Sequence, residues 1–361
     1  MAVLTTSRTW LNVAATTIEN YQPNFYDQIT DSLPIVKMMK QNASVQLDGG
    51  DGIIVEIMHK HNNTVGTVGE WDTLDLTPPS PFTAVRYDWK DMAGALSVSG
   101  DEIDRNQGKS RMMNLLQGKI KNLRISFQNR LDTMLLGDGT GNNGKDLNGL
   151  SALITDSGTG TVGGIERDNN EWWRNVSYSY ATASNDSVYY GCAQGGTANT
   201  KTAADLVGAA GDDYDTTFLY SMDYVFDECS FGDTGPQMLL GSMGAWQRCK
   251  HTLLDNKRFD MADTMRADPG FRYVNFNGVP FAFTRKMNEV TNYGNSTDTQ
   301  RIYFLNFDFM NFWIHHKKNF KTTEFKTLLP KQEAWAMNMF LKAQLGVTKS
   351  NAQGLLHSIK I

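Results

Sequence analysis

The longest regular pattern of hydrophobic positions lies within residues 101–136. Large apolar side chains recur there at steps of three or four residues, which is the spacing of one face of an α-helix. Acidic residues crowd the first turn and Gly137 follows the last apolar position, so both ends carry the signals of helix termini. We therefore expect one long helix with a buried face, because charged flanking positions do not recur over enough heptads for a coiled coil. The apolar positions are Met112, Leu116, Ile120, Leu123, Phe127, Leu131 and Met134.

Residues 45–100 change to the pattern of β-strands. Apolar residues alternate along 53–58, and β-favouring side chains fill 84–90 and 95–99. Between them, residues 61–81 are rich in Gly, Thr, Asp and Pro and are far longer than an ordinary hairpin loop of about two to five residues. This loop has more apolar surface than a disordered linker needs, which predicts docking on a partner surface. Its apolar residues are Val65, Val68, Trp71, Leu74 and Leu76.

Residues 1–44 contain scattered aromatic and aliphatic anchors without a clean period. Such a segment cannot bury a core of its own, and it suits an arm that lies across other surfaces. The anchors include Trp10, Phe25 and Tyr26.

The second half of the chain alternates helical and strand patterns, as in a compact α/β unit. Asn277-Gly278 favours a tight reversing turn between two strands, and Ser242 stands where a helix N-cap belongs. We expect helices at 218–229 and from Ser242 to about residue 254, and strands at 238–240, 271–275, 279–284 and 301–306.

Two further segments have a different character. Residues 178–215 are rich in Ser, Thr, Ala, Gly and Asp and are interpreted as loops or an insertion. The tail, 311–361, combines a β-like run through His316, a final apolar stretch and a basic patch formed by Lys317, Lys318 and Lys321.

Composition excludes several classes of protein. The 361 residues are 40% hydrophobic and 20% charged, as in ordinary folded proteins. Lys and Arg number 34 against 39 Asp and Glu, which gives a formal charge of −5. The molecule as a whole therefore has no positive field that would attract nucleic acid, and any contact with nucleic acid must be local. The three cysteines lie far apart and suit a reducing cytoplasm. The N-terminus is too polar for a secretory signal and no apolar run could cross a membrane, so we expect a protein that is kept inside the cell.

Histidines and motifs give little sign of catalysis or metal binding. The sequence has no HExxH, no GxSxG and no paired-cysteine spacing. His59 and His61 would share one face of a strand, but two ligands without a third are weak evidence for a metal site. We therefore interpret both as solvent-facing. His315 and His316 are expected on opposite faces of a strand, which counts against a shared site. We expect no enzyme activity, no metal and no cofactor.

The segment 137–154 resembles nucleotide and calcium loops only superficially. Gly139 and Gly144-Lys145 partly match a phosphate-binding loop, but Asp146 stands where a magnesium-binding Ser or Thr belongs. No glutamate closes a calcium loop. A tight turn built from Gly and Asn is the better interpretation.

Trp172 and Trp173 stand side by side between charged residues. We interpret them as a buried corner that receives cation–π contacts from Arg167 or Arg174, with a dedicated ligand cage as the alternative.

Four short motifs, taken in order, resemble one known family. The order of arm, long loop, long helix and α/β unit is similar to that of the major capsid proteins of tailed bacteriophages, which have the Hong Kong 97 fold. The resemblance covers about residue 45 to the end of the chain and is weakest at 178–215. The motifs are Asn129-Arg130-Leu131-Asp132, Leu147-Asn148-Gly149-Leu150, Gly163-Gly164-Ile165 with Trp172-Trp173-Arg174, and Asn277-Gly278-Val279-Pro280.

The resemblance implies an α+β fold with named domains. It implies an arm that reaches a neighbouring subunit, an extended β-hairpin loop that lies over another, a peripheral domain with a long spine helix and an axial domain near the capsomer centre. The corresponding segments are 1–44 for the arm, 45–100 for the extended loop, 101–162 for the peripheral domain, 163–312 for the axial domain and 313–361 for the return to the peripheral domain.

The implied function is self-assembly, through pentamers and hexamers, into an icosahedral shell around the double-stranded DNA genome of a tailed phage. The implied location is the virion, assembled in the bacterial cytoplasm, with no membrane. The resemblance also implies a portal and a decoration protein as partners. A separate scaffolding protein is expected as well, since no charged helical scaffolding segment precedes the arm. The residues expected to contact other subunits are Trp10, Phe25, Tyr26, Val68, Trp71, Leu74 and Leu76.

Two features refine this expectation. Some family members join subunits covalently through a lysine of the extended loop, but residues 61–80 contain no lysine, which implies non-covalent docking here. The long helix has a basic polar face that could meet packaged DNA without sequence preference, or could instead be solvated or paired with neighbouring subunits. The residues of this face are Lys109, Arg111, Lys119, Lys121, Arg124 and Arg130.

Two other classes stay open from the sequence. A bacterial nanocompartment of the encapsulin type shares the fold but encloses an enzyme instead of a genome. A hydrolase or carbohydrate-binding protein with exposed tryptophans would behave as a monomer or a small oligomer.

Overall fold

The computed structural model describes residues 39, 45–62, 64–71, 73, 80–105, 109–180, 214–255, 273–284, 286–287, 300–327 and 334–359. The arm residues Trp10, Phe25 and Tyr26, and Leu74 and Leu76 of the loop, lie outside the described residues.

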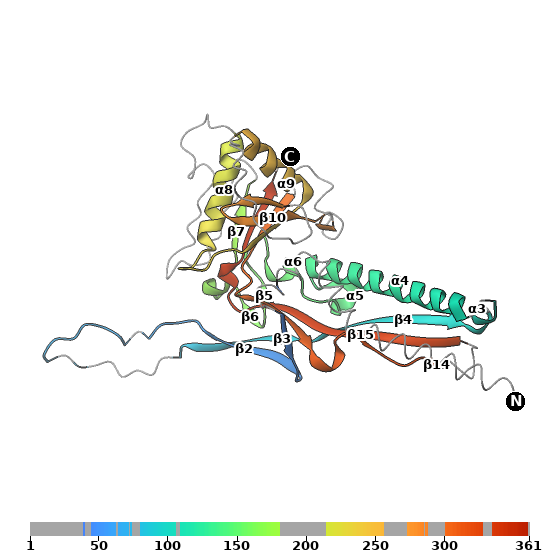
Figure 1. Ribbon diagram of the computed structural model, residues 1–361. Helices are drawn as coiled ribbons and strands as arrows, with labels where there is room; N and C mark the ends of the chain where they lie inside the picture. Colours follow the sequence, from blue (N-terminus) through green and yellow to red (C-terminus); the bar gives the residue numbers. More distant parts are fainter. Residues whose placement is uncertain are drawn as a thin grey trace.

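A first sheet of six strands is built around the long strand β15 (Figure 1). Ten residues of β4 pair antiparallel with β15, from Ala334 opposite Ser99 to Ala343 opposite Lys90. β12 pairs along another part of β15, and β1 joins β12 in parallel. The strands of this sheet are β1 (Val45–Asp48), β4 (Lys90–Ser99), β12 (Met310–His315), β13 (Lys321–Thr322), β14 (Lys326–Thr327) and β15 (Ala334–Val347).

A second sheet lies in the upper part of the molecule in Figure 1, next to two helices. Its strand order is β7-β16-β11-β8-β10-β9, and the side chains of β8 and β11 are buried throughout. The helices are α8 (Tyr214–Glu228) and α9 (Met243–Asp255). The strands are β7 (Val176–Ser179), β8 (Met238–Gly241), β9 (Tyr273–Phe276), β10 (Val279–Phe283), β11 (Gln300–Leu305) and β16 (Gly354–Ile359).

The α/β pattern of the second half is confirmed, with one correction. β9 and β10 form the expected hairpin, and Asn277 and Gly278 both have the positive φ that a tight reversing turn requires. Helix α9 follows Ser242, whose carbonyl oxygen accepts the Trp246 amide proton at 3.0 Å. The Ser242 hydroxyl, however, has no hydrogen-bond partner among the described residues. The prediction that this side chain caps the helix is therefore wrong.

The long helix is confirmed over its described part. Helix α4 (Lys109–Leu136) follows the short α3 (Gly100–Arg105), and residues 106–108 between them lie outside the described residues. Its apolar stripe is buried at Ile120, Phe127, Leu131 and Met134 and half-buried at Leu123, while the side chains of Met112 and Leu116 are not described. The helix packs closely on β4 at Gly94, where a methyl group would collide with the Phe127 ring.

The chain after α4 folds back against the end of the helix. The Gly137 amide donates to the Thr133 and Met134 carbonyls at 3.1 and 3.2 Å, which ends the helix at the expected residue. Gly149, the glycine of the LNGL motif, lies so close that a Cβ there would collide with the Met134 and Gly137 carbonyl oxygens. The motif is therefore a packing requirement of the helix terminus.

Gly149→Ala is expected to destabilise the fold by about 3 kcal/mol, because the new methyl group meets backbone oxygens that cannot rotate away. The control is Gly118→Ala in α4, where nothing lies within 4 Å of the new Cβ and the helix gains about 1 kcal/mol. Urea unfolding of both variants measures the difference. Equal stability of the two would contradict the packing role of Gly149.

Two cysteines are buried in the core of the second sheet. Cys229 and Cys249 are both inaccessible to solvent, and burial raises the pKa of the Cys249 thiol to about 12. A thiol of that pKa supplies almost no reactive thiolate at neutral pH. The third cysteine of the sequence is Cys192. When it is replaced by serine, we expect no fast reaction with a disulfide reagent in the native state and two reactive thiols after unfolding. Rapid native labelling would show that this core opens.

The strand pairing crosses the boundaries drawn from the sequence. Segment 45–100 includes β1 and β4, both of which pair within the first sheet. Segment 313–361 includes β16, which lies between β7 and β11 in the second sheet. The domain boundaries at 44, 100, 162 and 312 stay predictions.

Candidate interaction surface

A two-stranded ribbon projects from the body and carries the long loop (Figure 1). β2 (Gly52–Met58) and β3 (Phe82–Asp88) pair antiparallel along their whole length. The His59 amide donates to the Pro81 carbonyl at 2.9 Å and extends the ladder by one step. The alternation predicted at 53–58 is confirmed, because the odd positions are the more buried ones.

The inner side of the ribbon is anchored to the body. Ile53, Val85 and Tyr87 are buried in the main core. The Tyr87 hydroxyl donates to the Val347 carbonyl at 2.8 Å and accepts the Val347 amide proton at 3.1 Å. Burial raises the pKa of this hydroxyl, which stays protonated and keeps its donor. The base of the ribbon is thus fixed to the end of β15.

The GGI motif forms a second anchor for the ribbon. Gly163 and Gly164 turn between β5 (Thr161–Val162) and β6 (Ile165–Glu166), both with positive φ. The Gly163 carbonyl accepts the Arg86 amide proton at 2.9 Å. A Cβ at Gly163 would overlap the Val85 side chain, so only glycine lets this turn contact β3.

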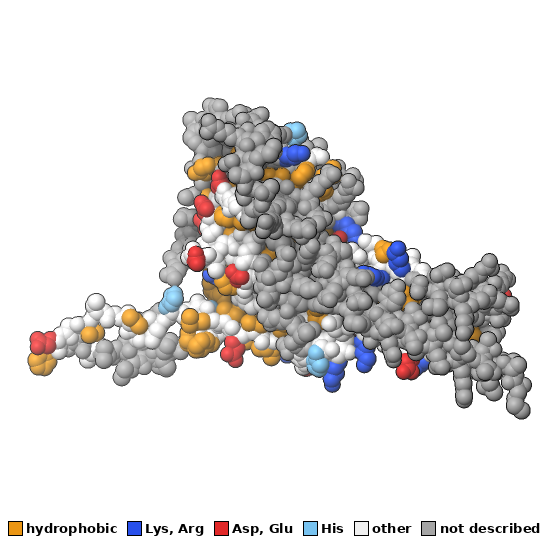
Figure 2. Space-filling model, in the orientation of Figure 1, with side chains coloured by type: hydrophobic (Ala, Val, Ile, Leu, Met, Phe, Trp, Pro, Cys, Tyr) orange, Lys and Arg blue, Asp and Glu red, His pale blue; other side chains and the backbone are white. Residues whose placement is uncertain are grey.

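The outer side of the ribbon and the loop expose apolar side chains. Met58 and Phe82 face each other across the ladder, and the Phe82 side chain is 69% exposed. In the loop, Val68 is exposed, Val65 is 83% exposed and Trp71 is 94% exposed. Figure 2 shows hydrophobic side chains, in orange, spaced along the projection. Such a row of large apolar groups marks an interaction surface.

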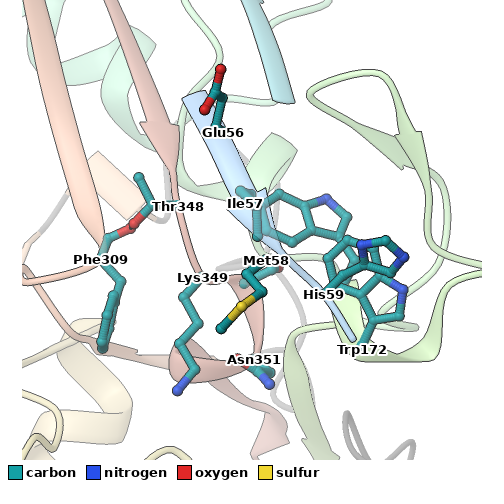
Figure 3. A pocket seen from close by; sticks show the side chains of 11 residues that line it. Glu56, Ile57, Met58, His59, Trp172, Phe309, Thr348, Lys349 and Asn351 are labelled. Atoms are coloured by element: carbon teal, nitrogen blue, oxygen red, sulfur yellow. The ribbon is translucent and has the colours of Figure 1, made fainter. Parts of the chain in front are cut away.

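A cavity of about 410 Å³ lies where the ribbon meets the body (Figure 3). The His59 and Trp172 rings lie against each other on one side, with 5.1 Å between their centroids and a tilt of 32°. On the other side, the Lys349 ammonium lies 3.5 Å from the centroid of the Phe231 ring. His59 is half-buried, so the prediction that it faces solvent is wrong, whereas His61 is exposed as expected.

The tryptophan pair forms the buried corner expected from the sequence. Trp173 is buried and its Nε1 donates to the Val162 carbonyl at 3.1 Å, while Trp172 is half-buried beside the cavity. Arg174 donates its Nε proton to the Arg167 carbonyl at 2.9 Å and lies 3.8 Å from the Glu171 carboxylate. Among the described contacts of this corner none is a cation–π pair, so that part of the prediction is wrong.

Arg167 is fully buried and joins two nearby segments of the chain to a third that is distant in sequence. It donates to the Leu153 carbonyl, to Asn175 Oδ1 at 3.0 Å and to Ser350 Oγ at 2.8 Å. Burial lowers its pKa to about 10, so the guanidinium is still charged at neutral pH. The sequence pointed to Arg167 only as a partner of tryptophan. The polar pocket that holds it comes from residues up to 183 positions away.

The basic face of α4 is partly neutralised within the chain. Lys119 contacts Glu102 at 2.6 Å, and this hydrogen bond lowers the pKa of the carboxyl group. Arg130 donates to both carboxylate oxygens of Asp146, at 2.9 and 2.6 Å. Lys121 is exposed and Arg124 is half-buried. The side chains of Lys109 and Arg111 are not described.

His315 and His316 stack on each other instead of pointing to opposite faces. Their ring centroids are 5.0 Å apart with an interplanar angle of 11°. The expectation failed because β12 ends at His315 and a 3₁₀ turn, η2 (His316–Lys318), begins at the next residue. Slight desolvation, His316 and Lys342 lower the pKa of His315.

The described residues contain no group of three His, Cys, Asp or Glu side chains that could hold a metal ion.

The turn at 141–144 uses Asn142 and Asn143 with positive φ, as the Gly-Asn interpretation predicted. Within the described part of the chain, no helix combines the length and the apolar character that a membrane span requires.

No family model matches the chain, and no curated protein is similar to it in sequence. Solved structures do match. A chain of the cyanophage A-1(L) capsid is 14% identical, with a TM-score of 0.56 over 88% of this chain and 90% of that one. A chain of the Myoviridae phage XM1 capsid is 12% identical, with a TM-score of 0.52 over 88% and 91%. A capsid chain of a native GTA particle is 13% identical, with a TM-score of 0.50 over 88% and 89%. The resemblance seen in the sequence is thus confirmed at the level of the fold, and this chain has the Hong Kong 97 type of fold found in tailed-phage capsids.

Proposed function

We propose that this chain is a major capsid protein, which self-assembles through pentamers and hexamers into the icosahedral shell around the double-stranded DNA of a tailed phage. The fold supports this proposal. The observation that carries it is the projecting loop, where Val65, Val68 and Trp71 stand in solvent far from any core of their own.

The energetics favour association. Burying one large apolar side chain is worth about 1.5–3 kcal/mol, and the ribbon and loop expose several of them in a row. The ribbon is fixed at its base by Tyr87 and by the Gly163 turn, so little ordering entropy is lost there on docking. The same contact, repeated by symmetry, closes a shell.

We further propose the location and the partners of the protein. It belongs to the virion, is assembled in the bacterial cytoplasm, and meets a portal, a separate scaffolding protein and a decoration protein. The exposed Lys121, with the other basic side chains of α4, contacts packaged DNA without reading its sequence. Lys119 and Arg130 contribute less to that contact, because the carboxylates of Glu102 and Asp146 partly neutralise them within the chain.

The test is expression in bacteria followed by negative-stain electron microscopy. Shells, tubes or capsomers support the proposal. A stable monomer under all ionic conditions, alone and with its co-expressed neighbours, would contradict it and would favour the carbohydrate-binding alternative. The content of purified particles separates the two kinds of shell, because a capsid holds a genome and a nanocompartment holds an enzyme.

A further inference from the structure

A lysine that follows β10 reaches across to the long helix α4. The Lys286 ammonium donates to the Asn129 backbone carbonyl at 3.0 Å and to Asn129 Oδ1 at 3.1 Å. The same ammonium lies 3.6 Å from the Asp132 carboxylate. Asn129 and Asp132 are three residues apart, which places them on one face of the helix. An amine, a carboxamide and a carboxyl group therefore meet where segments 157 positions apart in the chain touch.

This cluster is partly shielded from water. The side chains of Lys286 and Asp132 are 24% and 17% exposed. The next residue, Met287, is buried in the main core, which anchors the segment beside the helix. Burial raises the pKa of the Asp132 carboxyl group, and the nearby Lys286 charge opposes this shift only in part. Asp132 is therefore a better proton acceptor than an exposed aspartate.

The cluster contains every group that an isopeptide bond between two side chains requires. Lysine supplies the nucleophile, the asparagine carboxamide supplies the carbonyl carbon, and the aspartate can accept and return a proton. We propose that Lys286 and Asn129 of the same chain become joined by an isopeptide bond, with Asp132 as the proton acceptor. The bond would fasten the segment after β10 to α4 within one subunit. It would not link neighbouring subunits, and it needs no lysine in the extended loop.

The atoms of the reaction balance without any other reactant. The Lys286 ammonium first gives a proton to the Asp132 carboxylate, which leaves a neutral amine. The Nζ lone pair then attacks Asn129 Cγ. One hydrogen of the attacking nitrogen passes to Nδ2, the Cγ–Nδ2 bond breaks and ammonia leaves. The ammonia takes the proton stored on Asp132 and restores the carboxylate. Nothing is oxidised or reduced, and no water is consumed.

The folded chain makes this reaction favourable in geometry. Holding the amine against the carboxamide converts an encounter between two molecules into a step within one, and such positioning can supply a large part of a reaction barrier. Each chain needs to react only once, so a slow step is sufficient. The product closes a long loop of the chain, which restricts the unfolded state and makes the fold harder to open.

Mass spectrometry of the denatured full chain tests the bond. The wild type is expected to be lighter than its sequence by one ammonia, and digestion should yield a branched peptide that joins Lys286 to Asn129. Lys286→Arg is the matched variant, because it keeps the positive charge and hydrogen-bond donors but has no nucleophilic amine. It is expected to show its full sequence mass. A wild-type chain of full sequence mass, or one that has lost ammonia without the branched peptide, would overturn the proposal.

A second pair of variants tests the proton acceptor. A positioned acid or base contributes about 10²–10⁴-fold to a rate, so Asp132→Asn is expected to form the branched product at least about a hundredfold more slowly. The control is Asp146→Asn, which removes another carboxylate that contacts α4, through Arg130, and is expected to react like the wild type. Circular dichroism verifies the fold of each variant. Equal rates for the two variants would refute the role of Asp132. The bond lies within one chain, so these results do not depend on whether shells form.

Discussion

Replacing Arg167 by methionine is expected to lower the free energy of unfolding by about 3–5 kcal/mol, which makes it one of the most damaging single changes in this chain. Methionine fills a similar volume but donates no hydrogen bond. The Leu153 carbonyl, Asn175 Oδ1 and Ser350 Oγ would lose a charged donor in a place that water does not reach. Unsatisfied buried acceptors, and not lost packing, account for the effect.

The matched control is Arg86→Met. Arg86 lies in strand β3, its side chain is 60% exposed, and its ion pairs with Asp51 and Asp88 are long, at 3.8 and 3.4 Å. Exposed pairs of this kind contribute about 0–1 kcal/mol. Chemical denaturation of the two purified variants gives the comparison. A loss below about 1 kcal/mol at Arg167 would show that the buried network is not a major source of stability.

The elements that the sequence predicted well are those whose evidence is local. Helix α4 follows from the spacing of Ile120, Phe127 and Leu131, because a helix places every third or fourth side chain on one face. The hairpin of β9 and β10 follows from Asn277-Gly278, since few other residue pairs adopt positive φ so easily. In both cases the residues that decide the structure are neighbours in the chain.

The features that sequence reasoning missed depend on contacts between distant residues. No residue near His59 in the sequence indicates that the Trp172 ring will lie against it. The GGI motif was visible, but its purpose depends on Val85, which lies on another element. The apolar residues of β16 show that the strand is buried but not that it pairs with β7 and β11. The loop is an intermediate case, because its apolar composition predicted exposure to a partner without identifying the partner.

The largest effect on assembly is expected from the loop itself. Replacing residues 61–80 by Asn-Gly closes the ribbon with a three-residue loop, Lys60-Asn-Gly, next to the His59–Pro81 ladder bond, and its last position is the glycine that such loops favour. The protomer should stay folded, because Ile53, Val85 and Tyr87 still anchor the ribbon. Particle yield should fall at least about a hundredfold, since each apolar loop side chain contributes about 1.5–3 kcal/mol when it is buried between subunits and about 1.4 kcal/mol is a factor of ten.

A second variant separates the chemistry of the loop from its length. Residues 61–80 are replaced by a Gly-Ser sequence of the same length, which keeps the reach of the loop but removes Val65, Val68 and Trp71. If these side chains carry the contact, this variant should be as defective in assembly as the deletion while unfolding at the wild-type urea concentration. Normal shells from the Gly-Ser variant would mean that the loop is only a spacer, and the apolar docking surface would have to lie on the outer side of the ribbon, at Met58 and Phe82.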